Sequence, residues 1–208
     1  MTEKAWLDRW NKRFGEDEYA YGVSPNDFLK ERLDKLDPGT ILFPAEGEGR
    51  NAVYAAKSGW TVSAFDISEE GRKKAMKLAE AEGVNVDYRI GELERLDYAE
   101  GNFDAIGLIY AHFPPALKSA YHKALADLLH PGGIVILEAF GKRHIEYNSK
   151  DPKVGGPNNV EALFSTEEVR DDFQGFEILE LEEKEIELNE GLYHIGRGSV
   201  VRFVGKKR

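Results

Sequence analysis

The stretch ILFPAEGEGRNAVYAA, residues 41–56, passes from an apolar run into a turn of small and acidic residues and then into a helix-like segment. Glycines after the first strand of a doubly wound sheet let the backbone approach a ligand at the carboxyl ends of the strands. Gly47 and Gly49 would form that turn. Asp66 ends the next apolar segment, roughly 20 residues further on, where a carboxylate can bind ribose hydroxyls. The stretch therefore predicts a site for an adenosine-containing cofactor.

Strand and helix signals alternate on both sides of this turn. We expect strands near 40–45, 61–65, 86–90, 103–110 and 134–140, and helices at 49–58, 68–82 and 115–129. The last two β-rich segments, 176–188 and 198–207, are joined by too few residues for a crossover helix and should pair antiparallel. The sequence predicts an α/β fold with a doubly wound, mostly parallel seven-stranded sheet and a C-terminal antiparallel hairpin.

The chain has 208 residues, which suits a single domain, 1–208. Within it we expect an N-terminal helical segment (1–39), a cofactor-binding core (40–140) and a C-terminal part with a loop, a short helix and the hairpin (141–208).

Three local signals place boundaries within these parts. Ser24 and Pro25 predict the N-cap and first residue of the second helix, and HPGG at 130–133 predicts a turn before the fifth strand. Ser165 and Glu168 predict a capping box.

Composition restricts the partners and the compartment. The chain has 28 basic and 38 acidic residues, a net charge of −10, which would repel a phosphate backbone, so we expect no nucleic acid partner. No apolar run approaches the roughly 18 residues of a membrane span, and the N-terminus lacks the pattern of a signal peptide. The chain has no cysteine and no paired histidine ligands, so we expect no metal, and a cytoplasmic location is the default expectation.

Charge in the turn separates two cofactor classes. Gly47-x-Gly49-x-x-Ala52 also satisfies a loose dinucleotide pattern. Glu46 and Glu48 would place two carboxylates beside a doubly anionic pyrophosphate, and Arg50 offsets only one of them. S-adenosylmethionine carries an ammonium, a sulfonium and one carboxylate, so it matches the turn better. The remaining alternative is an ordinary strand–turn–helix junction with solvated glutamates.

The segments PAEGEGRN, AFDIS, RIGELERLDYAEGNFDAI and LLHPGGIVILEAF occur in that order, and the sequence over 40–140 resembles class I S-adenosylmethionine-dependent methyltransferases. The resemblance implies that Asp66 binds ribose and that Ile67 touches adenine. Glu92 would accept a hydrogen bond from the adenine amino group, and Leu93 would lie against the ring.

The same resemblance implies that the glycine-rich loop, with Gly47, Gly49 and Asn51, holds the methionine end of the cofactor. The family usually has an acidic residue where Phe43 stands, and Glu46 is the candidate to bind the amino group instead.

The flanking segments resemble the tellurite-resistance and thiopurine group of small-molecule methyltransferases. The shared N-terminal positions are Trp10, Phe14, Tyr21, Gly22, Pro25, Phe28 and Leu29. The similar C-terminal segments are 155–173 and 188–203, which resemble the tellurite-resistance branch. In such enzymes the N-terminal segment closes over the cofactor, which implies that Trp10 and Tyr21 belong to a lid. Packing of an amphipathic helix is the alternative role for both residues.

Methyl transfer is an in-line displacement, so a base is needed only for poor nucleophiles. Thiolates and chalcogen oxyanions attack unaided, whereas a hydroxyl must lose a proton. His112, at the carboxyl end of the fourth strand, is the candidate base, with a role in the pocket wall as the alternative, and Tyr110 is expected to line the cofactor pocket. Arg143 could orient an anionic acceptor or be a solvated loop charge, and His194 is a further candidate wall residue.

The sequence HFPPA at 112–116 lacks the residues that flank Pro-Pro in the methyltransferases of adenine or glutamine, which favours a small diffusible acceptor. The hypothesis is methyl transfer from S-adenosylmethionine to a small molecule such as a thiol or a chalcogen oxyanion, tellurite for example. An NAD(P)-dependent oxidoreductase and a non-catalytic S-adenosylmethionine-binding domain are the alternatives. The sequence leaves the oligomeric state open.

Overall fold

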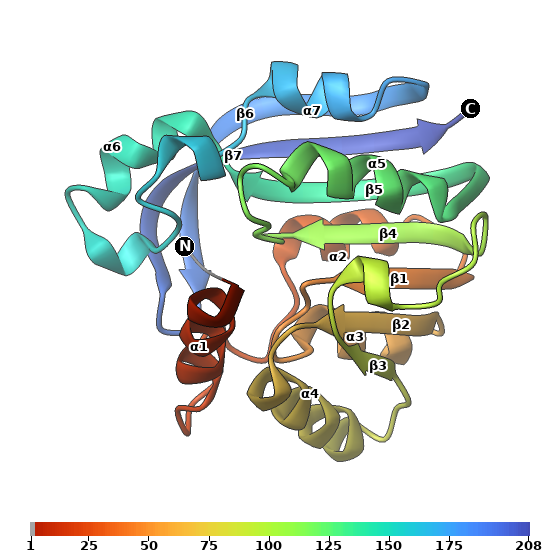
Figure 1. Ribbon diagram of the computed structural model, residues 1–208, viewed down its shortest axis with the longest axis horizontal. Coiled ribbons are helices and arrows are strands. Elements are labelled where there is room, and N and C mark those ends of the chain that lie inside the picture. Colours follow the sequence, from red (N-terminus) through yellow and green to blue (C-terminus); the bar gives the residue numbers. More distant parts are fainter. Residues whose placement is uncertain (1–2) are drawn as a thin grey trace.

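The computed structural model describes residues 3–208. Seven strands form one sheet in this part of the chain, and helices cover both of its faces (Figure 1). The strands are β1 Thr40–Pro44, β2 Thr61–Asp66, β3 Asp87–Ile90, β4 Phe103–Ile109, β5 Leu129–Phe140, β6 Phe176–Glu190 and β7 His194–Lys207. The helices are α1 Glu3–Phe14, α2 Asp27–Leu33, α3 Arg50–Lys57, α4 Glu69–Glu82, α5 Lys118–Asp127, α6 Ile145–Asn148 and α7 Thr166–Asp172.

The strand order is β3-β2-β1-β4-β5-β7-β6. β1 pairs in parallel with β2 and β4, β2 with β3, and β4 with β5, whereas β7 runs antiparallel between β5 and β6. β6 therefore runs parallel to β5. The prediction of a doubly wound, mostly parallel sheet with an antiparallel C-terminal hairpin is confirmed. The order reverses between β1 and β4, and ligands of such sheets bind at this switch point.

The sheet separates two hydrophobic cores, one on each of its faces. Leu42 and Ile106 face one core with residues of α5 and α7. Ile41 and Phe43 face the other with residues of α2, α3 and α4. Successive residues of β1 are thus buried on alternate faces, which explains why a central parallel strand has a continuous apolar sequence.

Two predicted boundaries are wrong. The N-cap of α2 is Asn26, not Ser24, and its side-chain oxygen accepts from the backbone N–H of Leu29 at 3.0 Å. HPGG does not precede the fifth strand but lies within β5, because Leu129 already pairs with Phe103 before an irregularity in the register. The capping box of α7 is confirmed, with both reciprocal bonds between Ser165 and Glu168.

The loop expected at the beginning of the C-terminal part is not irregular throughout, because residues 141–164 contain α6 and three short 3-10 turns. Val154 and Leu163 from this segment are buried beside Phe140 in a third, smaller core. These contacts hold the segment against the carboxyl end of β5, next to the switch point.

No helix within residues 3–208 is long and apolar enough to cross a membrane.

Candidate functional site

The switch point carries two residues with unusual backbone conformations. Ala45, directly after β1, and Tyr110, directly after β4, have φ values of 51° and 49°. Non-glycine residues rarely adopt such angles, which cost free energy and cluster at functional sites. The strain lies at the carboxyl ends of the two strands between which the sheet order reverses, where a ligand is expected.

Asp66 ends β2 within this region and is buried. Its carboxylate accepts from the N–H of Gly47 at 3.0 Å and from the N–H of Ser68 at 2.8 Å. Burial raises the pKa of Asp66 to about 6, although these backbone donors favour the charged form. The residue expected at the ribose is therefore fixed directly beside the glycine-rich turn.

Glu46 occupies the N-terminus of α3. One of its carboxylate oxygens accepts from the N–H of Asn51 at 2.9 Å and from the N–H of Ala52 at 2.8 Å. Gly49 is the N-cap of this helix and has no side chain to bind these groups. Burial raises the pKa of Glu46 to about 7. A dinucleotide pyrophosphate uses the N–H groups at such a helix start, and here a carboxylate already binds them.

The carboxylate of Glu48 binds Ala20 and Lys74 instead of facing the predicted cofactor site. The expectation that both carboxylates of the turn lie beside the cofactor is therefore wrong. The Glu48 side chain accepts from the N–H of Ala20 and from the ammonium of Lys74, both at 2.8 Å. Glu48 is only 3% exposed. It attaches the chain after α1 to α4, a contact between segments far apart in the sequence.

Packing between elements explains much of the glycine pattern. A Cβ on Gly47 would lie 2.9 Å from the ring of Phe14, and one on Gly49 would lie 2.6 Å from the Cβ of Ala75. Asn51 is buried, and its side-chain oxygen accepts from the N–H of Asn26 at 2.9 Å. The structure thus gives the Asn51 side chain a partner within the protein, whereas the resemblance assigned it to the cofactor.

The residues expected at adenine lie beside Asp66. The N–H of Gly91 donates to the Asp66 carbonyl at 3.0 Å, which brings the turn after β3 to the end of β2. Glu92 follows and is partly exposed, and Leu93 is buried against one of the cores. Ile67, next to Asp66, is half-buried. The structure therefore brings Ile67, Glu92 and Leu93 to the same edge of the sheet.

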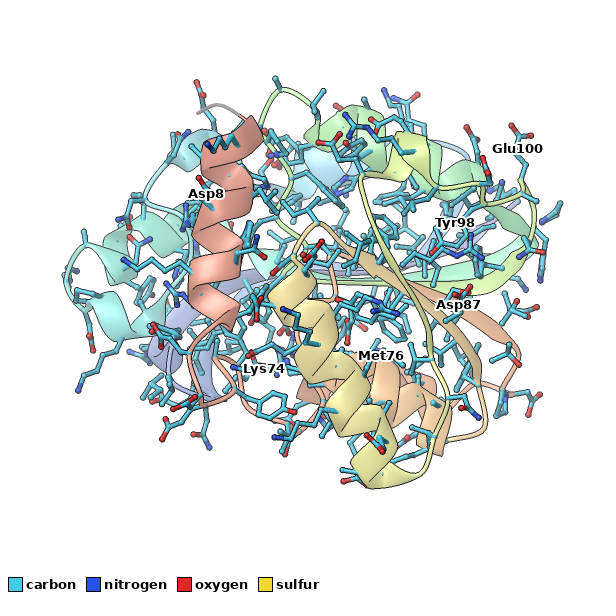
Figure 2. All side chains as sticks on the ribbon, turned by 60° about the horizontal axis from the view of Figure 1, so that its bottom comes forward. Asp8, Lys74, Met76, Asp87, Tyr98 and Glu100 are labelled. Atoms are coloured by element: carbon cyan, nitrogen blue, oxygen red, sulfur yellow. The ribbon has the colours of Figure 1, made fainter. Side chains whose placement is uncertain are left out.

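α1 lies across this edge, alongside α4 (Figures 1 and 2). Phe14 is buried against Gly47, and Trp10 stacks on Phe14 with ring centroids 5.4 Å apart. Asn11 accepts a hydrogen bond of 2.7 Å from the Ser68 hydroxyl. Tyr21 continues the aromatic row, with its ring 6.5 Å from that of Phe14.

Figure 2 shows Lys74 projecting from α4 toward the chain that follows α1, where its ammonium donates to the Glu18 carbonyl at 2.6 Å. The N-terminal segment thus lies where a lid is expected.

Two predicted histidines surround the ring of Phe140. His112 stacks on it at 6.2 Å, and His194 meets it edge-on at 5.1 Å. Nδ1 of His112 is buried and has no hydrogen-bond partner among the described residues. Burial lowers the pKa of His112 to about 3, so this imidazole is a weak base.

His194 begins β7 and lies at the switch-point edge, because β7 runs antiparallel to β5. Its Nδ1 is 2.8 Å from the carboxylate of Glu190. The rings of Tyr21 and Tyr110 are 4.5 and 4.6 Å from the imidazole. Burial lowers the pKa of His194, and Glu190 opposes that shift.

Tyr110 lies close to the predicted cofactor turn and donates from its hydroxyl to Glu138 at 2.9 Å. Burial raises the pKa of this phenol well above its usual value.

Arg143 is not part of this group. It is exposed, and its guanidinium lies 3.4 Å from Glu183 on β6. The adjacent His144 is buried instead: its Nε2 is 3.0 Å from the Gly155 carbonyl, and its Nδ1 accepts from the N–H of Ser199. Arg143 therefore faces solvent and Glu183, whereas His194 and the Nδ1 atom of His112 are buried.

Sequence reasoning missed two carboxylates that organise the site, the buried Glu138 and the partly buried Glu190. Glu138, 1% exposed, accepts from Tyr110, from Asn26 at 2.7 Å and from Arg202 at 2.6 Å. Glu190 accepts from Arg50 and Asn26, both at 2.9 Å. A glutamate inside the apolar strand ILEAF was a usable signal for Glu138, since a buried charge needs partners. No local pattern identified Glu190.

A polar cavity of about 360 Å³ adjoins this network. It lies between the segment after α1 and the end of β6, and Tyr110, Glu138 and Glu190 contribute to its wall. Residues 3–208 contain no group of three or more side chains that could hold a metal ion.

Comparisons with known proteins agree with this geometry. Residues 41–133 match a family described as a methyltransferase domain. Over these residues the chain is similar to that family. The match covers the strands and helices that carry the turn, Asp66 and the end of β4. The match supports the prediction of a methyltransferase domain from the glycine-rich turn and its neighbours.

Two curated relatives are methyltransferases of 30% identity. One is the 2-methyl-6-phytyl-1,4-hydroquinone methyltransferase of Synechocystis, aligned over 53% of this chain and 35% of that protein. The other is a ubiquinone biosynthesis O-methyltransferase of Xanthomonas oryzae pv. oryzae, aligned over 66% and 59%. The chain spans about a third to three fifths of the length of these relatives.

Solved structures share the whole fold at lower identity. A protein of echinomycin biosynthesis, from a study of disulfide conversion into a thioacetal, matches with a TM-score of 0.76 and 17% identity over 98% of this chain and 91% of that one. An S-adenosylmethionine-dependent methyltransferase of Methanosarcina mazei matches at 0.69 and 18% over 89% and 99%. TehB of Haemophilus influenzae matches at 0.70 and 17% over 97% and 67%. The class I methyltransferase fold is thus shared by all three, and the domain match supports S-adenosylmethionine as the cofactor.

Proposed function

We propose that the protein transfers a methyl group from S-adenosylmethionine to a small-molecule acceptor. The position of Glu46 at the start of α3, beside Asp66, carries this proposal. The site offers a carboxylate where a dinucleotide would place its pyrophosphate, and a cofactor with an ammonium group suits that charge. The same argument disfavours the NAD(P)-dependent alternative.

In this proposal the turn with Glu46, Gly47 and Gly49 holds the methionine end, while Asp66 binds the ribose. Ile67, Glu92 and Leu93 form the adenine end, and Tyr110 lines the pocket. The side chain of Asn51 acts indirectly, because its bond to the N–H of Asn26 positions the segment that closes the site. When bound, S-adenosylmethionine supplies the methyl group, and the protein contributes alignment and exclusion of water.

We further propose that α1 and the segment to Tyr21 form the lid, and that α1 is the part that moves. The contacts of Phe14 with Gly47 and of Asn11 with Ser68 support this role, since they seat α1 directly on the proposed cofactor turn. Trp10, stacked on Phe14, would then report on cofactor binding.

Two acceptor classes have support. The resemblance of the flanks to the tellurite-resistance and thiopurine group, together with the fold shared with TehB, favours a thiol or chalcogen oxyanion. The relative named as an O-methyltransferase favours a hydroxyl. Within the proposal the chain acts as a single domain in the cytoplasm. Arg143 faces solvent and Glu183, so we give it no role at the acceptor.

The test is thermal unfolding of the purified protein with S-adenosylhomocysteine or NAD. A ligand of the native state raises the midpoint by mass action, and saturation at 100 times Kd corresponds to about 2.7 kcal/mol. We expect a shift with S-adenosylhomocysteine alone. A shift with NAD alone would refute the proposal. Formation of S-adenosylhomocysteine from S-adenosylmethionine and an acceptor would exclude the non-catalytic alternative.

A further inference from the structure

The five histidines of the chain have different environments, and only one combines an ionic partner with a place at the switch point. His130 pairs with Asp104 near the opposite end of β4, and His122 pairs with Asp172 between α5 and α7. Both ring nitrogens of His144 have backbone partners. His112 has a buried Nδ1 with no partner among the described residues. His194 pairs with Glu190.

The contact between Glu190 and His194 defines the state of the imidazole. An ionised carboxylate can only accept a hydrogen bond, so Nδ1 of His194 must be the donor. Nε2 then has a free lone pair, and no hydrogen bond to Nε2 is present among residues 3–208. Burial alone would raise the pKa of Glu190, but Arg50 and His194 outweigh it and lower the pKa to about 2. Glu190 therefore stays charged across the physiological range.

Glu190 is itself held firmly. The guanidinium of Arg50 donates to the carboxylate oxygen that faces His194, and the amide of Asn26 donates to the other, both at 2.9 Å. Rings of Tyr21, Tyr110 and Phe140 enclose the imidazole, which is 3% exposed. A carboxylate that fixes a histidine tautomer beside a reaction site is the arrangement of a general base and its positioning residue.

We propose that His194 is the general base of the methyl transfer, that Glu190 is its positioning residue, and that the acceptor is a hydroxyl group that must lose its proton. This inference rests on the proposed function. Nε2 of His194 takes the hydroxyl proton while the acceptor oxygen forms a bond to the methyl carbon. The carbon–sulfur bond breaks, and its electrons neutralise the sulfonium. Glu190 stabilises the imidazolium, which later releases the proton to water.

The pair also selects among the acceptor classes. Chalcogen oxyanions are already anionic, and a thiol, with a pKa of about 8.5, ionises more readily than a phenol, so a base held by a carboxylate gives these classes less advantage. A phenol or catechol hydroxyl is largely protonated at neutral pH, and a positioned base contributes on the order of 10²- to 10⁴-fold to such reactions. The geometry therefore favours the hydroxyl class over the thiol and oxyanion classes.

The first experiment needs no acceptor and measures the tautomer of His194 by the nitrogen and carbon chemical shifts of its imidazole in the S-adenosylhomocysteine complex. We expect a proton on Nδ1 and none on Nε2 at pH 7.5. In Glu190→Gln we expect the pKa of His194 to fall, because Arg50 then faces the ring without its carboxylate partner. A proton on Nε2 in the unaltered protein overturns the proposal. Other charged and titratable groups near His194 also affect its titration. Besides Glu190 and Arg50 they are Arg13, Tyr21, Tyr110, His112, Glu138 and His144.

The second experiment compares three probe acceptors, catechol, thiophenol and tellurite, by the formation of S-adenosylhomocysteine. We expect turnover of catechol, a loss on the order of 10²-fold or more in kcat for His194→Gln, and an acid limb of the pH profile that moves lower in Glu190→Gln. The exposed Glu177 on the same strand provides the matched control, Glu177→Gln, which should leave both measurements unchanged.

The outcomes distinguish failure of the proposal for His194 from failure of the proposed methyltransferase function. Unaltered kcat in a folded His194→Gln, or turnover of thiophenol or tellurite without turnover of catechol, overturns the inference. A protein that binds S-adenosylhomocysteine but methylates none of the three probes also overturns the hydroxyl assignment, while the cofactor proposal stands. Failure to bind S-adenosylhomocysteine refutes the proposed function itself.

Discussion

Replacing Glu48 by alanine should release the N-terminal segment from the body of the protein. The carboxylate joins two elements: it accepts from the N–H of Ala20, just after α1, and from Lys74 on α4, both at 2.8 Å. Glu48 is 3% exposed and Lys74 is 15% exposed, so water screens neither group well. Glu48→Ala leaves a buried N–H without an acceptor and a largely buried ammonium without its carboxylate.

The magnitude follows from these two losses. A hydrogen bond to a charged group contributes roughly 1.5 to 3 kcal/mol, and an unpaired buried group adds a penalty of about 1 to 3 kcal/mol. Lys74 keeps its bond to the Glu18 carbonyl, which limits the penalty. We therefore expect Glu48→Ala to lower the free energy of unfolding by about 3 kcal/mol. For a chain of this length, that corresponds to a midpoint lower by roughly 6 to 12 °C.

Urea unfolding followed by circular dichroism measures this loss, and limited proteolysis shows whether the first 20 residues become accessible. The matched control is Glu70→Gln, which removes an exposed partner of Lys73 on the same helix and should change stability little. A loss in Glu48→Ala no larger than that of the control, with unchanged proteolysis, would refute the view that Glu48 anchors the segment after α1.

Three further predictions concern the turn and the lid. The pKa of Glu46 is raised to about 7, and an ammonium group on the ligand binds the ionised carboxylate better than the neutral acid. The affinity for S-adenosylhomocysteine should therefore weaken as the pH falls below 7, by a factor that approaches about tenfold per pH unit. Calorimetry at several pH values should show a weaker pH dependence of the affinity for Glu46→Gln. Gly49→Ala should lower the free energy of unfolding by about 1 to 3 kcal/mol more than Gly83→Ala. Both glycines have positive φ, but only a new Cβ at position 49 would clash, at 2.6 Å from the Cβ of Ala75. An equal loss for the two variants in urea unfolding would contradict this. Binding of S-adenosylhomocysteine should change the tryptophan fluorescence, and Trp10→Phe should remove most of this change. Trp60→Phe replaces a buried core residue and should keep the change. A fluorescence change that survives in Trp10→Phe would exclude Trp10 from the lid.

The parts of the site that the sequence predicts well depend on short-range geometry. The turn after β1 and the carboxylate at the end of β2 follow from strand and helix periodicity, since parallel strands bring their carboxyl ends to one edge. Asp66 and Gly47 are therefore found together, and a 3.0 Å hydrogen bond joins them. The capping box at Ser165 is equally local, because both of its bonds lie within one turn of helix.

The parts that the sequence does not predict depend on pairs far apart in the chain. Asn26 reaches Glu138 across 112 positions, and Arg50 reaches Glu190 across 140. The orientation of Glu48 is of the same kind, since its partners lie on α4 and after α1. Periodicity places such residues on an element but does not say which side chain a distant segment brings to them.

The same long-range contacts connect closure of the site to its chemistry. The segment from Ala20 to Asn26 is attached at both ends, by Glu48 at the first and by Asn51, Glu138 and Glu190 at the second. Between these ends Tyr21 lies 4.5 Å from the imidazole of His194. A lid that opens in α1 alone leaves this segment in place, so the environment of His194 stays formed while the acceptor and cofactor exchange. Opening that also displaces Asn26 must instead break its bonds to Glu138 and Glu190, and each such bond to a charged acceptor is worth roughly 1.5 to 3 kcal/mol. The difference in cost favours movement of α1 about Gly15 and the residues that follow it, up to the attachment at Ala20.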